Sequence, residues 1–124
     1  MPLTNAYRDF LVQATLGLGI TPFNAANSRI GVGDGTTAFD PSQNDLQGTN
    51  KIRLVMDAGF PTYSGGTMTF QSTAANTQAN FAWEEWGVFN QGSGGVMMNR
   101  KVEPMGTKVS GSVWTIRVSI TLSV

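Results

Sequence analysis

The segment that decides the fold class is Ser112-Val-Trp-Thr-Ile-Arg-Val-Ser-Ile-Thr-Leu-Ser-Val124. Every second residue from Trp114 to Val124 is apolar, and the residues between them are Thr, Ser and Arg. Side chains alternate across a β-strand with a period of two, so this segment has one apolar face and one mostly polar face. On a helix the same apolar residues would spread around the whole circumference. We therefore predict a C-terminal strand over residues 112–124 that is tied into a sheet up to its end.

Further short segments of the same kind occur along the chain. Apolar or alternating stretches cover residues 29–33, 51–58, 67–73, 81–89 and 96–102. Glycine-rich or polar turns divide them, and two longer loops are predicted at residues 36–50 and 104–111. Short strands that recur about every 8–12 residues are typical of antiparallel sandwiches and jelly-rolls. We therefore predict a mainly β protein, an antiparallel β-sandwich or jelly-roll, that forms a single domain over residues 1–124.

One amphipathic helix is predicted before the first strand. Thr4 is suited to be its N-cap, and Gly17 and Gly19 are suited to end it. Apolar residues recur between them at three- and four-residue spacing: Tyr7, Phe10, Leu11, Ala14 and Leu18. This spacing predicts a helix over residues 5–16 with one apolar stripe. The stripe has two interpretations, since it either covers one face of the sheet or docks on a neighbouring subunit.

Composition excludes several classes of function. The 124 residues include no Cys and no His, which removes disulfides, the commonest general base and the commonest metal ligand. Eight basic and eight acidic residues balance, so the positive field that nucleic-acid binding requires is missing. No apolar run reaches the roughly 18 residues of a membrane span, and no secretion signal is seen. Charged residues make up only 13% of the chain, so its surface is either rich in Ser, Thr, Asn and Gln or covered by neighbours.

Two sequence patterns resemble ligand-binding motifs, but each lacks residues that the motif requires. Gly31-Val-Gly-Asp-Gly35 is rich in glycine, but it lacks the third glycine of a dinucleotide fingerprint and the lysine of a P-loop. Asp34, Asp40 and Asp45 do not follow the ligand spacing of a calcium-binding EF-hand loop. Aspartates in such a segment ordinarily form turns. We predict no cofactor and no metal site.

Glu84 and Glu85 are the only adjacent carboxylates, and a pair of carboxylates is the machinery of a glycosidase. Neighbours on a strand point to opposite faces, however, so a shared catalytic site is unfavourable. We predict instead that one glutamate is partly buried and paired with a basic residue such as Arg100, and that the protein is not an enzyme. Four aromatic residues occupy the same segment: Phe81, Trp83, Trp86 and Phe89. They form either a platform on which sugars stack or part of a core or interface.

Several segments together resemble small structural proteins of tailed bacteriophages. These segments are Ile30-Gly-Val-Gly-Asp-Gly-Thr-Thr37, Asp45-Leu-Gln-Gly48, Ala79-Asn-Phe-Ala-Trp-Glu-Glu-Trp-Gly-Val-Phe-Asn90, Gly94-Gly-Val-Met-Met-Asn-Arg-Lys-Val102 and Thr107-Lys108. In that group an N-terminal helix precedes an "IxVGDGTT" strand, a polar loop, a "DLxG" step and an "EWGVFN" or "EIGLFN" segment. The likeness runs over nearly the whole chain, and the closing alternating strand completes it.

The resemblance implies a non-enzymatic β-sandwich subunit that works by occupying a place in a virion assembled in the bacterial cytoplasm. Members of the group belong to the head or to the tail. The sequence ends directly after its last predicted strand, without the stalk of fibre-like members. This favours an auxiliary head subunit, a capsid decoration or cement protein. The alternatives are a tail-associated subunit of the fibre, baseplate or collar and, less favoured, a carbohydrate-binding module.

The expected partners are the major capsid protein or tail proteins, together with further copies of the chain. Symmetric assembly is the rule for such subunits, and a trimer on a local three-fold axis is the preferred arrangement. The helix region 4–18 and the loop 36–50 are the expected contact elements. The residues predicted to form the interface are Tyr7, Phe10, Leu11, Phe39, Trp83, Trp86 and Met97.

Overall fold

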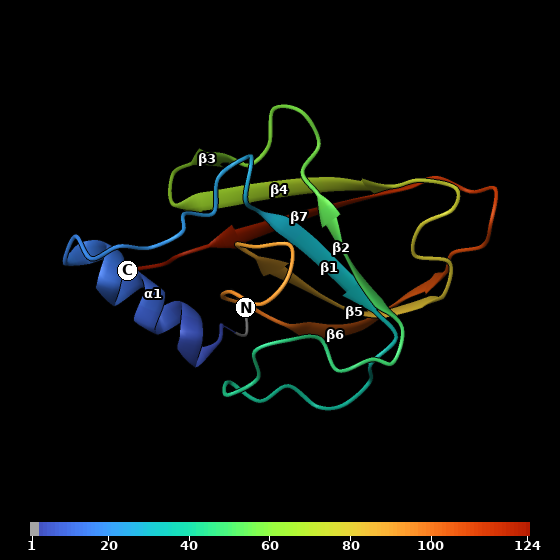
Figure 1. Cartoon of the computed structure of the whole chain (residues 1–124), viewed down its shortest axis with the longest axis horizontal. Helices are drawn as coiled ribbons and strands as arrows, with labels where there is room; N and C mark the ends of the chain where they lie inside the picture. The colour runs from blue at the N-terminus through green and yellow to red at the C-terminus, as the bar shows by residue number, and fades with distance from the viewer. Residues whose placement is uncertain (1–2) are drawn as a thin grey trace.

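The computed structural model describes residues 3–124 as one helix and two antiparallel sheets (Figure 1). The elements are α1 (Asn5–Thr15), β1 (Arg29–Gly33), β2 (Lys51–Val55), β3 (Thr62–Ser64), β4 (Thr67–Ala74), β5 (Ala82–Phe89), β6 (Lys101–Thr107) and β7 (Trp114–Thr121). One sheet has the strand order β2-β1-β5-β6, and the other has the order β3-β4-β7. The prediction of a mainly β sandwich with one N-terminal helix is confirmed.

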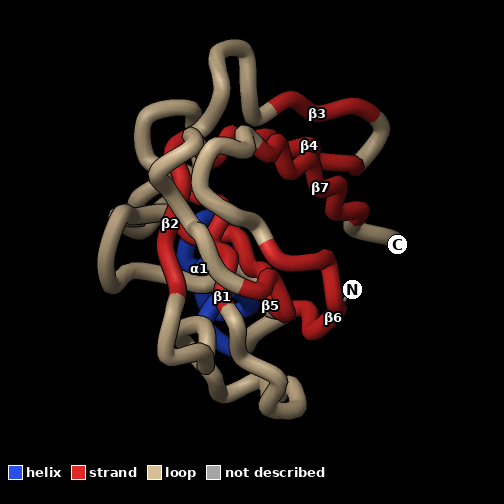
Figure 2. The backbone as a smooth tube through the Cα atoms, turned by 90° about the vertical axis from the view of Figure 1, so that its right-hand side faces the viewer, coloured by secondary structure: helices blue, strands red, loops and turns tan. Residues whose placement is uncertain are grey.

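The two sheets are joined along one side. Met56, which follows β2, forms an isolated bridge with Ser72 of β4, and the Asp57 amide donates to the Gln71 carbonyl at 2.8 Å. The other side carries the outer edges of β6 and β7, which lie on the same side of the molecule in Figure 2. Within residues 3–124, β4 is the only strand that pairs with β7.

The alternation that predicted the C-terminal strand is present in β7. Ile116, Val118 and Ile120 are buried in the core between the sheets, and the residues between them are exposed. The predicted end at residue 124 is wrong, because β7 stops at Thr121. Its partner β4 begins at Thr67, which is paired with Thr121, so no strand is left for residues 122–124 to pair with.

The strand predicted at residues 96–102 and the loop predicted at 104–111 also need correction. The regular strand in this region is β6, which contains Pro104, whereas Met97 and Asn99 make only isolated bridges. Proline lacks the N–H group that a central strand must donate, but an edge strand has one unpaired side and tolerates it. Because β6 is the edge of its sheet, Pro104 does not break it.

The helix begins and ends at the predicted signals but is anchored through its first half alone. The Thr4 hydroxyl accepts a hydrogen bond from the Tyr7 amide at 3.1 Å, and Gly17 has a φ of 72°, the left-handed conformation that commonly ends a helix. Tyr7 and Phe10 pack with Phe23 in an aromatic cluster with ring centroids 5.0–5.6 Å apart. The helix therefore lies at one end of the sandwich in Figure 1 and does not cover a sheet face along its length.

Candidate functional site

The most distinctive polar feature is an ion pair inside the protein. Glu85 lies on β5 and Arg100 directly precedes β6, and Arg100 Nε is 2.7 Å from Glu85 Oε1. Both side chains are fully buried. The prediction that one glutamate pairs with Arg100 is confirmed, and Glu84 is the one that is partly exposed. Burying two charges requires that their remaining hydrogen-bonding capacity also be satisfied.

The Glu85 carboxylate meets that requirement through the backbone of the long loop. Its Oε2 accepts from the amides of Gly35 and Gly48, and its Oε1 accepts from the Gln47 amide, each at 2.8 Å. With Arg100, four donors surround one carboxylate. The two glycines are required by space, since a Cβ on Gly35 would lie 2.5 Å from Glu85 Oε2 and one on Gly48 would lie 2.6 Å from the Gly35 nitrogen.

Arg100 completes the attachment of the loop from the other side. Its Nη1 donates to the Thr37 carbonyl at 2.9 Å and to Gln43 Oε1 at 3.2 Å. The glycine-rich turn and the "DLxG" step, whose bonded amides Gly35 and Gln47 are 12 residues apart in the sequence, are therefore held by one ion pair. We name Glu85, Arg100 and the three amides bound to Glu85 the Glu85 hub. Both carboxylate oxygens of Glu85 and the Nε and Nη1 atoms of Arg100 are engaged within the protein, whereas Arg100 Nη2 is buried without a hydrogen-bond partner. These contacts attach the loop to the sandwich, which makes the hub an architectural site.

The three aspartates of the loop have separate partners. The Asp34 carboxylate accepts hydrogen bonds from the backbone amide and the side-chain Nδ2 of Asn50, and these hydrogen bonds lower the pKa of Asp34. Asp40 accepts from the hydroxyl and amide of Ser42, which lowers the pKa of Asp40. Among residues 3–124 no group of three or more His, Cys, Asp or Glu side chains is placed to hold a metal ion.

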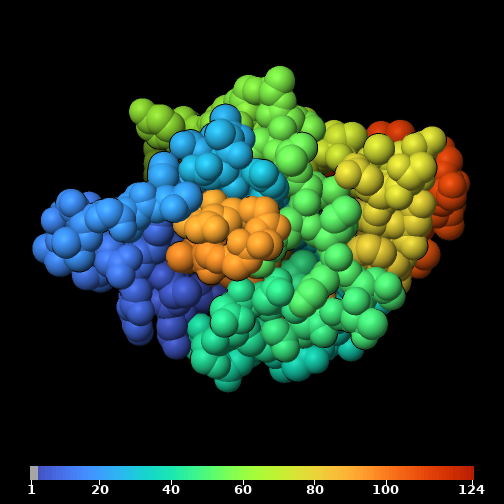
Figure 3. Space-filling view, viewed as in Figure 1, coloured from blue at the N-terminus to red at the C-terminus, as the bar shows by residue number. Residues whose placement is uncertain are grey.

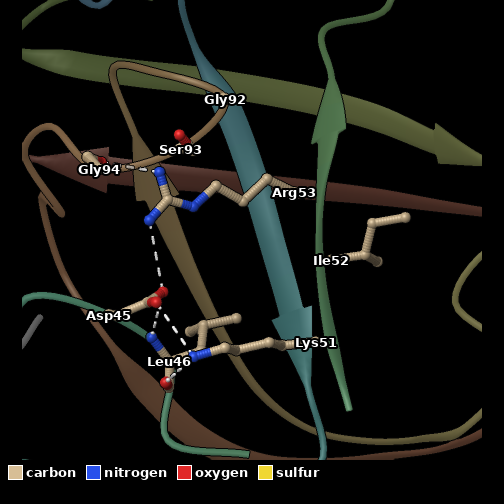
Figure 4. A pocket seen from close by; sticks show the side chains of 8 residues that line it. All are labelled: Asp45, Leu46, Lys51, Ile52, Arg53, Gly92, Ser93 and Gly94. Atoms are coloured by element: carbon tan, nitrogen blue, oxygen red, sulfur yellow. Dashed lines mark hydrogen bonds and ion pairs between the residues drawn. The ribbon is translucent and has the colours of Figure 1, made fainter.

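The third aspartate, Asp45, lines a charged pocket of about 240 Å³ together with Lys51, Arg53 and residues 92–94 (Figure 4). Lys51 Nζ is 3.0 Å from the Asp45 carboxylate, and Arg53 Nη2 is 3.4 Å from it. Burial raises the pKa of Asp45, but the hydrogen bond and charge of Lys51 and the charge of Arg53 outweigh it, so the pKa lies below its ordinary value.

Arg53 has further partners within the protein. Its Nη1 donates to the carbonyls of Gln91 and Gly94, at 3.0 and 2.8 Å, and its guanidinium lies 3.7 Å from the centroid of the Phe89 ring. Lys51 also donates to the Leu46 carbonyl at 3.1 Å. The charged groups of the pocket therefore connect the loop that contains Asp45 and Leu46 to the loop that contains Gln91 and Gly94. Lys51 and Arg53 both have internal partners.

The structure separates the predicted interface residues into two groups. Tyr7, Trp83, Trp86 and Met97 are 0–4% exposed and pack inside the subunit instead of facing a partner. Tyr7, Trp83 and Trp86 belong to the main core, and Met97 packs with Leu46 and Phe89 in a second, smaller cluster. Phe10, Leu11 and Phe39 are partly exposed.

The aromatic segment does not form a stacking platform. Trp83, Trp86 and Phe89 are buried, and Phe81 is partly buried against the core. The indole nitrogens also have internal acceptors, because Trp83 donates to the Ala79 carbonyl at 2.9 Å and Trp86 to Glu103 at 2.7 Å. A sugar that stacked on these rings would have to open the core, so the carbohydrate-binding interpretation loses its site.

Several exposed apolar side chains lie outside the set of predicted interface residues. Val12, Leu16 and Leu18, at the C-terminal end of α1, are 54–68% exposed. This end of the helix projects from the body at the left of Figure 3. Val113 and Leu122, which precede and follow β7 at its two ends, are 62% and 39% exposed. The helical stripe predicted Leu18 as an apolar contact, but Val12 and Leu16 lie outside it.

Comparisons with known proteins gave no significant match: no family model, no curated protein and no solved structure aligns with the chain. In the part of the chain that the structure describes, no helix has the length and apolar character to cross a membrane.

Proposed function

We propose that this protein is a non-enzymatic structural subunit of a tailed-bacteriophage virion, with the capsid surface as its preferred place. The segments that carry the resemblance to phage proteins meet at the Glu85 hub, where Gly35, Gly48, Glu85 and Arg100 hold the loop on the sandwich. In this hub, residues that are far apart in the sequence contact one another and thereby fix the fold of the loop. This supports the interpretation of the shared pattern as an architecture and not as a catalytic site.

The observation that carries the proposal is the exposed apolar end of α1. Val12 and Leu16 border a hollow of about 250 Å³ that Leu11 and Thr15 complete. Leu16 is 68% exposed, although the first half of the same helix is anchored in an aromatic cluster. Exposed apolar side chains gathered at one place mark contact sites. We infer that this end of the helix packs against the major capsid protein or a tail protein.

The mechanism is the addition of many modest contacts. A standard protein interface buries about 1,600 Å² in total, far more than the end of one helix offers, so the polar loop 36–50 and Phe39 contribute to the contact. Repeated copies on a symmetric particle convert weak local binding into a large stabilisation of the shell through multivalency. Self-association belongs to the proposal.

The first experiment measures the copy number of the chain in purified virions by quantitative mass spectrometry against the major capsid protein. Hundreds of copies per particle are expected for a head decoration subunit. A count near three, six or twelve would move the protein to the tail, which is the alternative function. Its absence from the particles would overturn the proposal.

The second experiment tests the contact element. Purified chain is mixed with particles that lack it, and bound protein is measured by co-sedimentation. The double variant Val12→Ser, Leu16→Ser is expected to bind at least about tenfold more weakly, because both side chains are exposed and their loss removes apolar contact area. Gln13→Ser, on the same helix, is the matched control and is expected to bind as the wild type does. Equal binding by all three proteins would remove α1 from the contact surface.

A further inference from the structure

The outer edge of β7 differs from the other three sheet edges. β3 has three residues, and β2 has five with Lys51 and Arg53 among them. β6 contains Pro104, and its register with β5 shifts near Trp83. Short length, charge, proline and irregular register are the usual devices that keep an edge strand from pairing with another chain.

The edge of β7 carries almost none of these devices. It has eight residues in unbroken register with β4, contains no proline or glycine, and bears one charge, that of Arg117. Its outward backbone N–H and C=O groups have no strand to pair with in residues 3–124. An edge of this kind is a template for one more antiparallel strand.

The alternation of apolar and polar residues along this strand is the same on both sides of Val118. Its apolar face carries Trp114, Ile116, Val118, Ile120 and Leu122. Its polar face carries Thr115, Arg117, Ser119 and Thr121. In an antiparallel pair with its own reversed copy, centred on Val118, apolar residues meet apolar residues, Thr115 meets Thr121, and Arg117 meets Ser119.

We propose that β7 pairs antiparallel with β7 of a second copy, with Val118 opposite Val118 of the partner subunit on a two-fold axis. In this register Ile116 faces Ile120, and the partly exposed Trp114 faces Leu122, which is 39% exposed in the single chain. The two three-stranded sheets become one six-stranded sheet with a continuous apolar face. An isologous contact of this kind is the commonest way in which identical subunits associate.

Charge and hydroxyl contacts select this register. With Val118 on the axis, Arg117 lies opposite Ser119 and Thr115 opposite Thr121. A shift that placed residue 117 on the axis would set two arginines directly opposite each other, which is destabilising. The chosen pairing also continues an existing ladder, because β4 and β7 already pair Thr67 with Thr121 at 2.7 Å and Thr73 with Thr115 at 3.2 Å between hydroxyls.

The inference specifies the self-association that is part of the proposed function, but its tests use purified copies of the chain alone and do not depend on placement in a virion. It gives self-association a two-fold geometry in place of the trimer that the resemblance favoured, because a three-fold contact would leave the β7 edges unpaired. The occupant is a second copy because the alternation of apolar and polar residues along the strand matches that of its own reversed copy.

Cross-linking tests the axis directly, because the chain has no cysteine of its own. Residues directly opposite each other in antiparallel strands have Cα atoms about 4.5–5.5 Å apart, which suits a disulfide. Val118→Cys is therefore expected to form a covalent dimer under oxidised glutathione. Ile120→Cys, the matched control, places its sulfur opposite Ile116 of the partner and is expected to stay largely monomeric on non-reducing gels. Equal cross-linking of both variants, or none of Val118→Cys, would overturn the register.

A pair of charge variants on the exposed polar face tests the association without cysteine chemistry. S119K sets Lys opposite Arg117 twice per dimer, and S119E sets Glu there. By sedimentation velocity we expect S119K to raise the dimer dissociation constant about five- to thirtyfold and S119E to lower it. Both variants lose the same hydroxyl contact to Thr69, so that loss cancels in the comparison. A monomer at all concentrations, a trimer, or a dissociation constant that is the same in both variants would contradict the proposal.

Discussion

The Glu85 hub and the edge of β7 use backbone hydrogen-bonding groups in opposite ways. At the hub, three amides of the loop are directed inward and satisfied by one buried carboxylate. Along β7, the outward groups of an eight-residue strand have no strand to pair with in the described chain. The hub is rich in charge and glycine, whereas the edge has a plain alternating sequence.

A glycine-rich motif is usually expected to bind a ligand and a plain alternating strand to serve the fold, but here we infer the opposite. The segment that looks most like a ligand-binding motif, Gly31–Gly35, serves the fold, because its amide at Gly35 is held by Glu85. The segment that looks most like ordinary structure, β7, is the one that offers unpaired groups to a partner. Spare hydrogen-bonding capacity at the surface is therefore a better guide to interaction than an unusual motif.

Removing one partner of the ion pair is expected to have the largest effect. Glu85→Gln leaves the Arg100 charge buried without a counter-ion, and the loss of stability should be about 3–5 kcal/mol. Urea unfolding followed by tryptophan fluorescence measures it. Glu84→Gln is the matched control, because Glu84 is partly exposed and is expected to change stability by less than about 0.5 kcal/mol. A loss below about 1 kcal/mol for Glu85→Gln would show that the hub is not what holds the loop.

Filling the space beside the hub is expected to have a smaller effect. A Cβ on Gly48 would lie 2.6 Å from the Gly35 nitrogen and 2.8 Å from the Asp34 nitrogen, so Gly48→Ala forces backbone to move and should cost about 1–3 kcal/mol. Gly19→Ala is the control, because nothing lies within 4 Å of its Cβ and its φ is not in the left-handed region. The same urea measurement applies. Equal stability of the two variants would mean that the loop adapts freely around Glu85.

The sequence predicted strands well where alternation was regular and where the partner strand was as long as the pattern. β1 occupies its predicted residues, and β4 and β5 differ from theirs by one residue. The end of β7 was overestimated because alternation continues to Val124, while pairing stops where β4 begins. β6 was misplaced because Pro104 signals a break in a central strand, and only the sheet order shows that this strand is an edge.

The hub was predicted in part for a related reason. Glu84 and Glu85 lie between Trp83 and Trp86, and this contrast between charge and aromatic neighbours is visible in the sequence. The amides of Gln47 and Gly48 are not, since every residue except proline has an N–H group and nothing in the sequence marks which ones a carboxylate binds. The exposure of Leu16 depends on how far α1 extends beyond the sandwich, which is decided by tertiary packing.

The smallest expected effect is at the surface of the same loop, where Asp34 holds Asn50. The folded-state pKa of Asp34 is lowered from 3.8, first by the Asn50 side chain and then by its amide. A lowered folded pKa means that the contribution to stability is present above about pH 3.8 and is lost as the pH falls through the folded value. The Asn50 amide signals in NMR should therefore shift with a midpoint below 3.8, and the acid transition should be absent in Asp34→Asn. Because Asp34 is solvent-exposed and Glu85 is buried, the loop should stay on the sandwich after Asp34 is protonated. Release of the whole loop in that step would mean that surface hydrogen bonds, and not the hub, hold it.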